Sequence, residues 1–188
     1  MEIISDKYIN LMQPIAMTIG KFDGIHLGHM ALIKKTVEYA RNLCIPSMVF
    51  TFNPNPVSVL SGKIFTPLLN EQQKISILSG MGIDILVNYP FDKAFASISA
   101  DAFMRLIFAD LKCRALIVGE SFSFGKDRKG EVFMLVNTGK RYGAIVEVMK
   151  NLELDGEPVS SSRIRKAIEC NDIPLAERLL NRPIEALE

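Results

Sequence analysis

The sequence has almost no net charge, few cysteines and only two histidines. Its 22 Lys and Arg nearly balance 21 Asp and Glu, and the net charge of +1 at pH 7 gives no overall attraction to nucleic acid or to an anionic membrane. The three cysteines, Cys44, Cys113 and Cys170, lie far apart and show no CxxC or other metal-ligand spacing. We therefore expect three buried thiols in a reducing compartment.

The chain also lacks any long apolar run, and residues 1–6 lack the basic-then-apolar pattern of a signal peptide. These absences predict a soluble cytoplasmic protein with no membrane partner. The length of 188 residues predicts a single domain over 1–188, large enough to bury a core without disulfides. Nothing in the sequence indicates an oligomeric state.

Short apolar runs alternate with helical patterns along the whole chain, which is typical of an α/β fold with a parallel sheet and helices on both faces. We expect about five strands, at 15–19, 46–52, 83–88, 114–119 and 144–149, with a candidate short strand at 2–5. Residues 53–69 are predicted as a rigid loop and small insertion, because Pro54 and Pro56 oppose both a helix and a central strand. The loops after the first, second and fourth strands should meet in one crevice at the carboxyl edge of the sheet.

The residues between the first strand and the first helix, 20–29, are called the glycine turn here. This turn contains three glycines and both histidines of the chain, at Gly20, Gly24, Gly28, His26 and His29. Glycines next to a helix N-terminus favour an anion site, usually for phosphate. Two imidazoles three residues apart would face the same side, donate hydrogen bonds to phosphate oxygens and add charge when protonated. The alternatives are an ordinary turn, or half of a metal site with Asp23 as the only nearby third ligand.

A second phosphate candidate is the serine- and arginine-rich run at 160–165. Serine hydroxyls cap helices, and arginine grips phosphate oxygens with two parallel hydrogen bonds. Taken alone, this run favours a serine-capped surface helix with solvated arginines. Together with the glycine turn, it favours a phosphate site.

The loop at 120–130, after the fourth strand, holds two alternating phenylalanines beside three basic residues. Phe122 and Phe124 could be core residues, and alone that interpretation is favoured. The functional alternative is a platform for a flat ring. Phe50 and Phe52 are expected to be ordinary strand residues.

Five segments, in order, resemble one family. Residues 20–29 contain an HxGH signature and residues 159–165 an SSxxIR signature, and the segments 51–56, 119–130 and 179–183 resemble further motifs. The pattern is similar to that of bacterial FAD synthetases, within the HxGH nucleotidyltransferase superfamily, and covers nearly the whole chain.

The resemblance implies a Rossmann-like nucleotidyltransferase fold that transfers AMP from ATP to FMN, giving FAD and pyrophosphate. The implied partners are the small molecules ATP and FMN, with Mg²⁺ bound through the ATP phosphates and not by a protein metal site. The implied catalytic residues are His26, His29 and Arg165. The implied ATP-binding residues are Gly20, Phe22, Asp23, Gly24, Gly28, Ser161, Ser162 and Arg163. The implied flavin-binding residues are Phe52, Asn55, Pro56, Ser121, Phe122, Phe124, Gly125 and Arg128.

Two departures from the family pattern fall on the flavin side. The family usually has Pro-His-Pro where this chain has Pro54-Asn55-Pro56, and Asn or Asp where it has Ser121. The alternatives are therefore a nucleotidyltransferase with a different phosphorylated acceptor, a non-catalytic flavin- or nucleotide-binding paralogue, and an α/β interaction module. The chain stops about where the riboflavin kinase domain of bifunctional members would begin, so no riboflavin kinase activity is expected.

Overall fold

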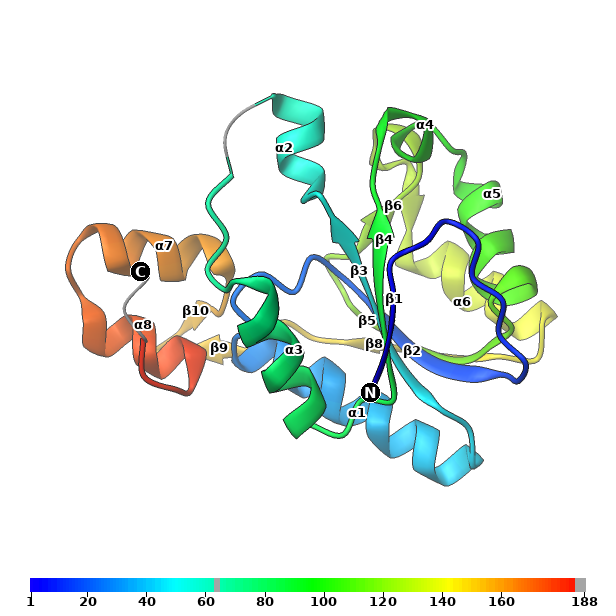
Figure 1. Cartoon of the computed structure of the whole chain (residues 1–188), viewed down its shortest axis with the longest axis horizontal. Coiled ribbons are helices and arrows are strands. Elements are labelled where there is room, and N and C mark those ends of the chain that lie inside the picture. Colours follow the sequence, from blue (N-terminus) through cyan, green and yellow to red (C-terminus); the bar gives the residue numbers. More distant parts are fainter. Residues whose placement is uncertain (63–64, 185–188) are drawn as a thin grey trace.

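A six-stranded, all-parallel sheet forms the centre of the molecule (Figure 1). The structure is a computed structural model that describes residues 1–62 and 65–184. The strand order is β1-β4-β3-β2-β5-β8. The bounds are β1 Glu2–Ile4, β2 Ile15–Ile19, β3 Ser47–Asn53, β4 Ile85–Pro90, β5 Cys113–Gly119 and β8 Ile145–Met149. The predicted α/β class, the five strands and the candidate strand at 2–5 are all confirmed.

The strand order reverses between β2 and β5. From β2 the chain moves outward through β3 to β4, then crosses back to β5 on the other side and continues to β8. Since every pair in this sheet is parallel, all strands end at the same edge. The carboxyl ends of β2 and β5 therefore mark the place where an open α/β sheet forms its ligand crevice.

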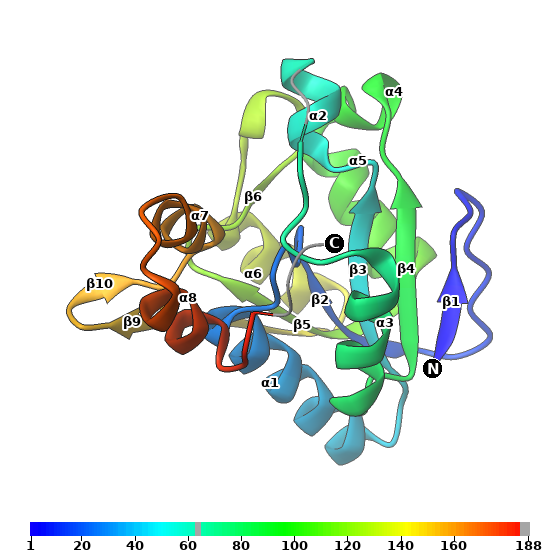
Figure 2. The same ribbon diagram turned by 60° about the vertical axis from the view of Figure 1, so that its left-hand side comes forward.

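Helices cover both faces because strand side chains alternate in direction. Ile15, Met17 and Ile19 face the main core, which is closed by one set of helices, whereas Ala16 packs toward the opposite face. The main core is closed by α5 (Ala100–Arg105), the π-helix η1 (Leu106–Asp110) and α6 (Val132–Arg141). The other face carries α1 (Leu27–Leu43) and α3 (Glu71–Gly80), as Figure 2 shows. No helix among residues 1–62 and 65–184 is long and apolar enough to cross a membrane.

The C-terminal segment forms a small unit with a core of its own. It comprises a hairpin, β9 (Glu153–Leu154) and β10 (Glu157–Pro158), followed by α7 (Ser161–Glu169) and α8 (Ile173–Leu180). Leu27 from the start of α1 and Leu68 pack against this core. The unit therefore lies against the glycine turn, beside the sheet (Figure 1).

The prediction of a loop over 53–69 is wrong in part, because a short helix, α2 (Pro56–Ser61), begins inside it. The Asn55 side chain accepts a hydrogen bond from the Val57 backbone N–H at 2.9 Å. Pro56 occupies the first turn, where a missing N–H costs nothing. A second short helix, α4 (Lys93–Ala96), lies close to α2 and was not predicted either.

The expectation of three buried cysteines holds only for Cys113, whose pKa is raised by burial. Cys44 and Cys170 are exposed. Both follow directly after a helix, at the C-caps of α1 and α7, where the chain turns at the surface.

Candidate functional site

The two histidines of the glycine turn stack on each other at the start of α1. Their ring centroids are 3.7 Å apart and their planes are inclined by 16°. His26 is the N-cap of α1, and its Nδ1 accepts a hydrogen bond from the His29 backbone N–H at 3.3 Å. A neutral imidazole that accepts at Nδ1 carries its proton at Nε2. His26 can therefore donate to a phosphate oxygen without being protonated.

Glycine at position 28 leaves room for the His26 ring, and at position 24 it suits the backbone. A Cβ built on Gly28 would lie 3.3 Å from the His26 ring. At Gly24 the backbone has φ +86°, and a Cβ would meet the Leu68 side chain at 3.0 Å. Glycine thus allows the close approach at both positions, and at Gly24 also the backbone conformation.

Phe22 forms the floor of the histidine pair. Its side chain is fully buried, and its ring centroid is 5.1 Å from that of His29. Phe22 was expected among the ATP-binding residues. Its side chain lies under His29 and can support the imidazole, but it presents no surface to a ligand.

Burial keeps both imidazoles neutral. Burial lowers the pKa of His26 to about 4, against the opposing effect of the Asp23 carboxylate. Burial, with smaller contributions from His26 and Lys74, lowers the pKa of His29 well below its usual range. Near neutral pH the pair is therefore expected to carry little of the charge that protonation would add. The pair acts through oriented N–H donors instead.

Asp23 connects the two sequence motifs. Its carboxylate accepts a hydrogen bond from Arg165 Nη2 at 2.7 Å and another from the Leu68 backbone N–H at 2.9 Å. Its backbone carbonyl accepts a hydrogen bond from the Ser161 hydroxyl at 2.7 Å. The glycine turn and the 160–165 run, about 140 residues apart, therefore meet, as the phosphate hypothesis requires. We call this assembly the nucleotide side of the site.

The same contacts weigh against a metal site at the histidine pair. Both oxygens of the Asp23 carboxylate already accept hydrogen bonds, so the only nearby third ligand is engaged. In the part of the chain that the structure describes, no three or more His, Cys, Asp or Glu side chains gather to hold a metal ion.

Arg182, which was not among the expected site residues, holds the turn from the C-terminal side. Its guanidinium donates to the carbonyl of Gly24 and, at 3.1 Å, to that of Ile25. Thr51 adds a hydrogen bond from its hydroxyl to the Lys21 carbonyl at 3.0 Å. The sequence offered only a weak signal for Arg182, its position within the 179–183 motif.

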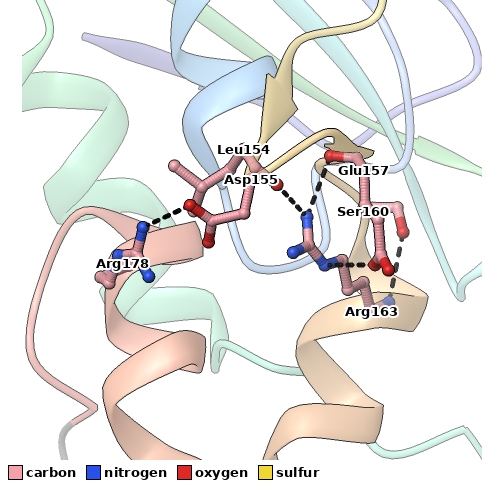
Figure 3. A network of polar contacts seen from close by, with 6 residues as sticks. All are labelled: Leu154, Asp155, Glu157, Ser160, Arg163 and Arg178. Carbon is pink, nitrogen blue, oxygen red and sulfur yellow. Dashed lines mark hydrogen bonds and ion pairs between the residues drawn. The ribbon is translucent and has the colours of Figure 1, made fainter.

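Arg163 points away from the glycine turn, into the β9–β10 hairpin (Figure 3). Its Nη1 donates to the carbonyls of Leu154 and Glu157, both at 2.9 Å, and its Nε pairs with the Glu157 carboxylate at 3.1 Å. Its side chain, expected to bind ATP, is thus committed to the hairpin. Ser162, by contrast, is exposed at the start of α7.

The acceptor side consists of residues 52–56 after β3 and residues 120–130 after β5. Phe52 packs edge-on against Phe91 at 5.4 Å between centroids and lies 6.0 Å from Phe95. Asn55 uses its side chain as the cap of α2, and Pro56 is buried. Two residues that the resemblance assigned to flavin binding, Phe52 and Asn55, therefore already contact neighbouring protein groups.

The 120–130 loop folds as a small hairpin, β6 (Ser123–Phe124) with β7 (Gly130–Glu131), around a 3₁₀ turn at 126–128. Phe124 is buried in the main core and stacks on Phe103 at 4.9 Å, so the core interpretation is correct for this residue. Phe122 is only partly buried, 5.9 Å from Phe124, and remains available as a platform.

The backbone of this hairpin packs against α5 at Gly125. The Arg128 side chain lies near Lys21 of the glycine turn. A Cβ on Gly125 would lie 2.8 Å from the Ala100 nitrogen. Arg128 donates from Nε to the Ser123 hydroxyl at 2.7 Å, and its charge, after burial, helps to lower the pKa of Lys21. Ser121 accepts a hydrogen bond from Asn151 Nδ2 at 2.9 Å. The loop after β5 therefore lies close enough to the glycine turn for the Arg128 charge to act on Lys21.

Lys74, in the first turn of α3, is a site residue that the sequence did not reveal. It is partly buried, and burial lowers its pKa against the opposing charges of Asp23 and Glu71. Its charge in turn helps to lower the pKa of His29. A lysine at the start of an amphipathic helix gives no sequence signal, because most such lysines face solvent.

Comparison with known proteins matches this chain to one family. A family model described as FAD synthetase matches residues 9–163. The bifunctional riboflavin kinase/FMN adenylyltransferase of Haemophilus influenzae is 35% identical over 175 residues, 92% of this chain and 57% of that protein. The Pseudomonas fluorescens protein of the same name is 38% identical over 167 residues, 88% of this chain and 54% of that one. The chain thus spans little more than half the length of these relatives.

A further relative is matched over nearly its whole length. The putative bifunctional riboflavin kinase/FMN adenylyltransferase of Geobacillus thermodenitrificans is 34% identical over 170 residues, 90% of this chain and 91% of that protein.

Two solved structures share the fold. A Streptococcus pneumoniae protein described as a macrolide-efflux protein superposes with a TM-score of 0.83 at 28% identity, covering 97% of this chain and 62% of that one. Pantothenate synthetase from Thermus thermophilus gives a TM-score of 0.55 at 13% identity, covering 96% of this chain and 81% of that one. This second likeness extends to the fold alone.

Proposed function

The chain belongs to the FAD synthetase family, and on that premise we propose that it transfers AMP from ATP to FMN. The observation that carries the proposal is the junction at Asp23. There Arg165 and Ser161 of α7 reach the turn that presents the two histidines. The Arg165 guanidinium thus pairs with the turn that carries the two imidazoles, which supports a shared role toward one anion.

The reaction needs positioning and charge stabilisation more than a protein nucleophile. A phosphate oxygen of FMN attacks the α-phosphorus of ATP, and the bond from that phosphorus to the oxygen bridging to the β-phosphate breaks. The electron pair leaves with pyrophosphate. His26 and His29 are proposed to donate to the phosphate oxygens whose charge grows in the transition state.

Arg165, Ser161 and Ser162 are proposed to hold the β- and γ-phosphates, with the Ser161 hydroxyl turning from the Asp23 carbonyl to a phosphate oxygen when ATP binds. Arg165 spends one nitrogen on Asp23, which orients the guanidinium and leaves further N–H groups for phosphate oxygens. Lys21, within the turn, and Lys74, whose charge acts on Asp23 and His29, are proposed to add positive charge. Mg²⁺ is proposed to bind through the ATP phosphates, where it would neutralise charge on the leaving group.

A nucleotidyltransferase with another phosphorylated acceptor is the second candidate. The observation that favours it is the engagement of the Asn55 Oδ1 in the cap of α2, which leaves only the NH₂ group of this side chain for an acceptor molecule. Pyrophosphate release with another phosphate ester, and none with FMN, would support this candidate.

The decisive experiment incubates the protein with FMN, ATP and Mg²⁺ and separates the products by chromatography. We expect FAD, and no FAD from the His26→Ala, His29→Ala double variant. Equal FAD from both proteins, or none from either, would overturn the proposal. Ligand binding by calorimetry without turnover would indicate a non-catalytic paralogue, and no thermal shift with ATP or FMN would indicate an interaction module.

The same sample tests the prediction that residues 1–188 form a single adenylyltransferase domain without riboflavin kinase activity. Incubation with riboflavin, ATP and Mg²⁺ should give no FMN. Formation of FMN at a rate comparable with that of FAD would contradict it.

A further inference from the structure

Ser121 and Asn151 leave the sheet from neighbouring strands at the reversal of strand order. Ile117 of β5 pairs with Thr18 of β2, so Gly119 lies level with Gly20 at the start of the glycine turn. On its other side, Gly119 pairs with Met149 of β8. Ser121 and Asn151 each follow two residues after that last pair. Both side chains therefore emerge at the carboxyl edge, beside the crevice and next to the nucleotide side.

Three hydrogen bonds fasten these two strand ends together. The Glu120 backbone N–H donates to the Met149 carbonyl at 2.9 Å, and the Asn151 backbone N–H donates to the Glu120 carboxylate at 2.8 Å. The third is the side-chain bond from Asn151 Nδ2 to the Ser121 hydroxyl at 2.9 Å. The backbone bonds fix where the two side chains lie, whatever the Asn151 side chain itself does.

Both side chains are exposed and retain hydrogen-bonding capacity. The Ser121 hydroxyl accepts from Asn151, so its own hydrogen is left for another acceptor. The Asn151 amide uses one hydrogen of its NH₂ group, which leaves the second hydrogen and the carbonyl oxygen. The pair thus offers donors and an acceptor side by side, next to the partly buried Phe122 ring.

We propose that Asn151 is a specificity-determining residue for the flavin acceptor, contributing through the Ser121–Asn151 pair the carboxamide that position 121 lacks. This inference rests on the proposed function. The polar edge of an isoalloxazine ring alternates carbonyl oxygens with a ring N–H, and a carboxamide can match that pattern with two hydrogen bonds. Ser121 is too short to do so alone, and Asn151 reaches the same place from the adjacent strand.

Reciprocal rescue tests this proposal. Asn151→Ala should raise KM for FMN about tenfold, because a polar group of the ring is then left unpaired. KM for ATP should stay within twofold. Adding Ser121→Asn to the Asn151→Ala variant should restore most of the lost FMN affinity, since the amide then comes from position 121. Asn137→Ala, which removes an exposed asparagine on α6, is the matched control and should match the wild type.

A purely structural role predicts a different pattern. It would lower the melting temperature and change both KM values together, with no rescue by Ser121→Asn. That pattern, or an unchanged KM for FMN in Asn151→Ala, would overturn the inference while leaving the proposed function intact. Wild-type protein that neither forms FAD nor quenches FMN fluorescence would overturn the proposed function, and the inference with it.

Discussion

The two sides of the site are held in different ways. On the nucleotide side, partners lie more than a hundred residues from the glycine turn: Ser161, Arg165 and Arg182 all reach it from the C-terminal unit. On the acceptor side, Asn55 and Arg128 form hydrogen bonds within their own loops, to Val57 and Ser123. A side chain in the first group cannot change without disturbing several segments, whereas one in the second group can. Of the two departures from the family pattern, Asn55 falls in the second group, whereas Ser121 has a partner on the neighbouring strand end.

The largest effect is expected from His29→Ala. Loss of one preorganised donor to the developing charge should lower kcat for FAD formation by about 10²–10³. The measurement is FAD formation at saturating ATP and FMN. A decrease of less than fivefold would mean that the buried, stacked imidazole supports the turn and does not act on the phosphates.

Asp23→Ala should show how much the contacts between the glycine turn and the C-terminal unit stabilise the protein. The variant removes the carboxylate that accepts from the partly buried Arg165 and from the Leu68 N–H, and we expect a loss of about 2 kcal/mol in the free energy of unfolding. For a chain of this size, that corresponds to a melting temperature lower by roughly 4–8 °C.

Asp155→Ala is the matched control for Asp23→Ala. Asp155, in the turn between β9 and β10, also pairs with an arginine, Arg178 of α8, but both side chains are about half exposed (Figure 3). Its loss should cost less than about 1 kcal/mol. Equal melting temperatures for the two variants would remove the basis for calling Asp23 the junction of the site.

The histidine pair should make stability depend on pH. The folded pKa of His26 is about 4, below the value near 6.5 of an unfolded histidine. Between these values the unfolded chain binds the proton and the folded chain does not, so stability falls as the pH drops through this window. His26 alone should cost about 1 kcal/mol at pH 5.5.

His26→Asn checks the origin of this dependence. Asparagine can keep the N-cap of α1 but cannot titrate. The difference in melting temperature between pH 7.5 and pH 5.5 should therefore shrink relative to the wild type. An unchanged difference would assign the acid sensitivity to other groups.

The smallest effect is expected on the acceptor side, from Asn55→Ala. The variant loses one cap, which is worth about 1 kcal/mol at a helix end, and this loss should fray α2 without unfolding the domain. KM for FMN should rise by less than about threefold, the change that roughly 0.6 kcal/mol would produce. Unfolding at the same temperature as Asp23→Ala would show that the acceptor side is coupled as strongly as the nucleotide side.

The sequence predicted the sheet and the shared side of the two histidines because both depend on local patterns. Apolar runs bounded by Gly and Pro determined the strands, and the spacing of His26 and His29 placed their rings on one side. Pro56 was misread because the same residue disfavours a helix interior and favours a helix start. The deciding factor, the Asn55 cap, is a contact of a single side chain.

Other parts of the site depend on contacts that no local pattern encodes. Arg163 and Arg165 are two residues apart and chemically identical, yet one binds the hairpin and the other binds Asp23. Their partners lie on different segments, so only the fold assigns them. Arg182 and Lys74 were not predicted for the same reason. Their roles depend on neighbours from distant segments, the Ile25 carbonyl for Arg182 and Asp23 and His29 for Lys74.

The Arg182 contact also determines when the glycine turn can be completed during synthesis of the chain. The carbonyl of Ile25 and the guanidinium that binds it are separated by 157 positions. During synthesis on the ribosome, β2 and α1 emerge long before Arg182 does, and Arg165 emerges 142 positions after Asp23. The nascent chain can therefore build most of its sheet while the nucleotide side is still incomplete, and the glycine turn gains its last contacts only after α8 has been made.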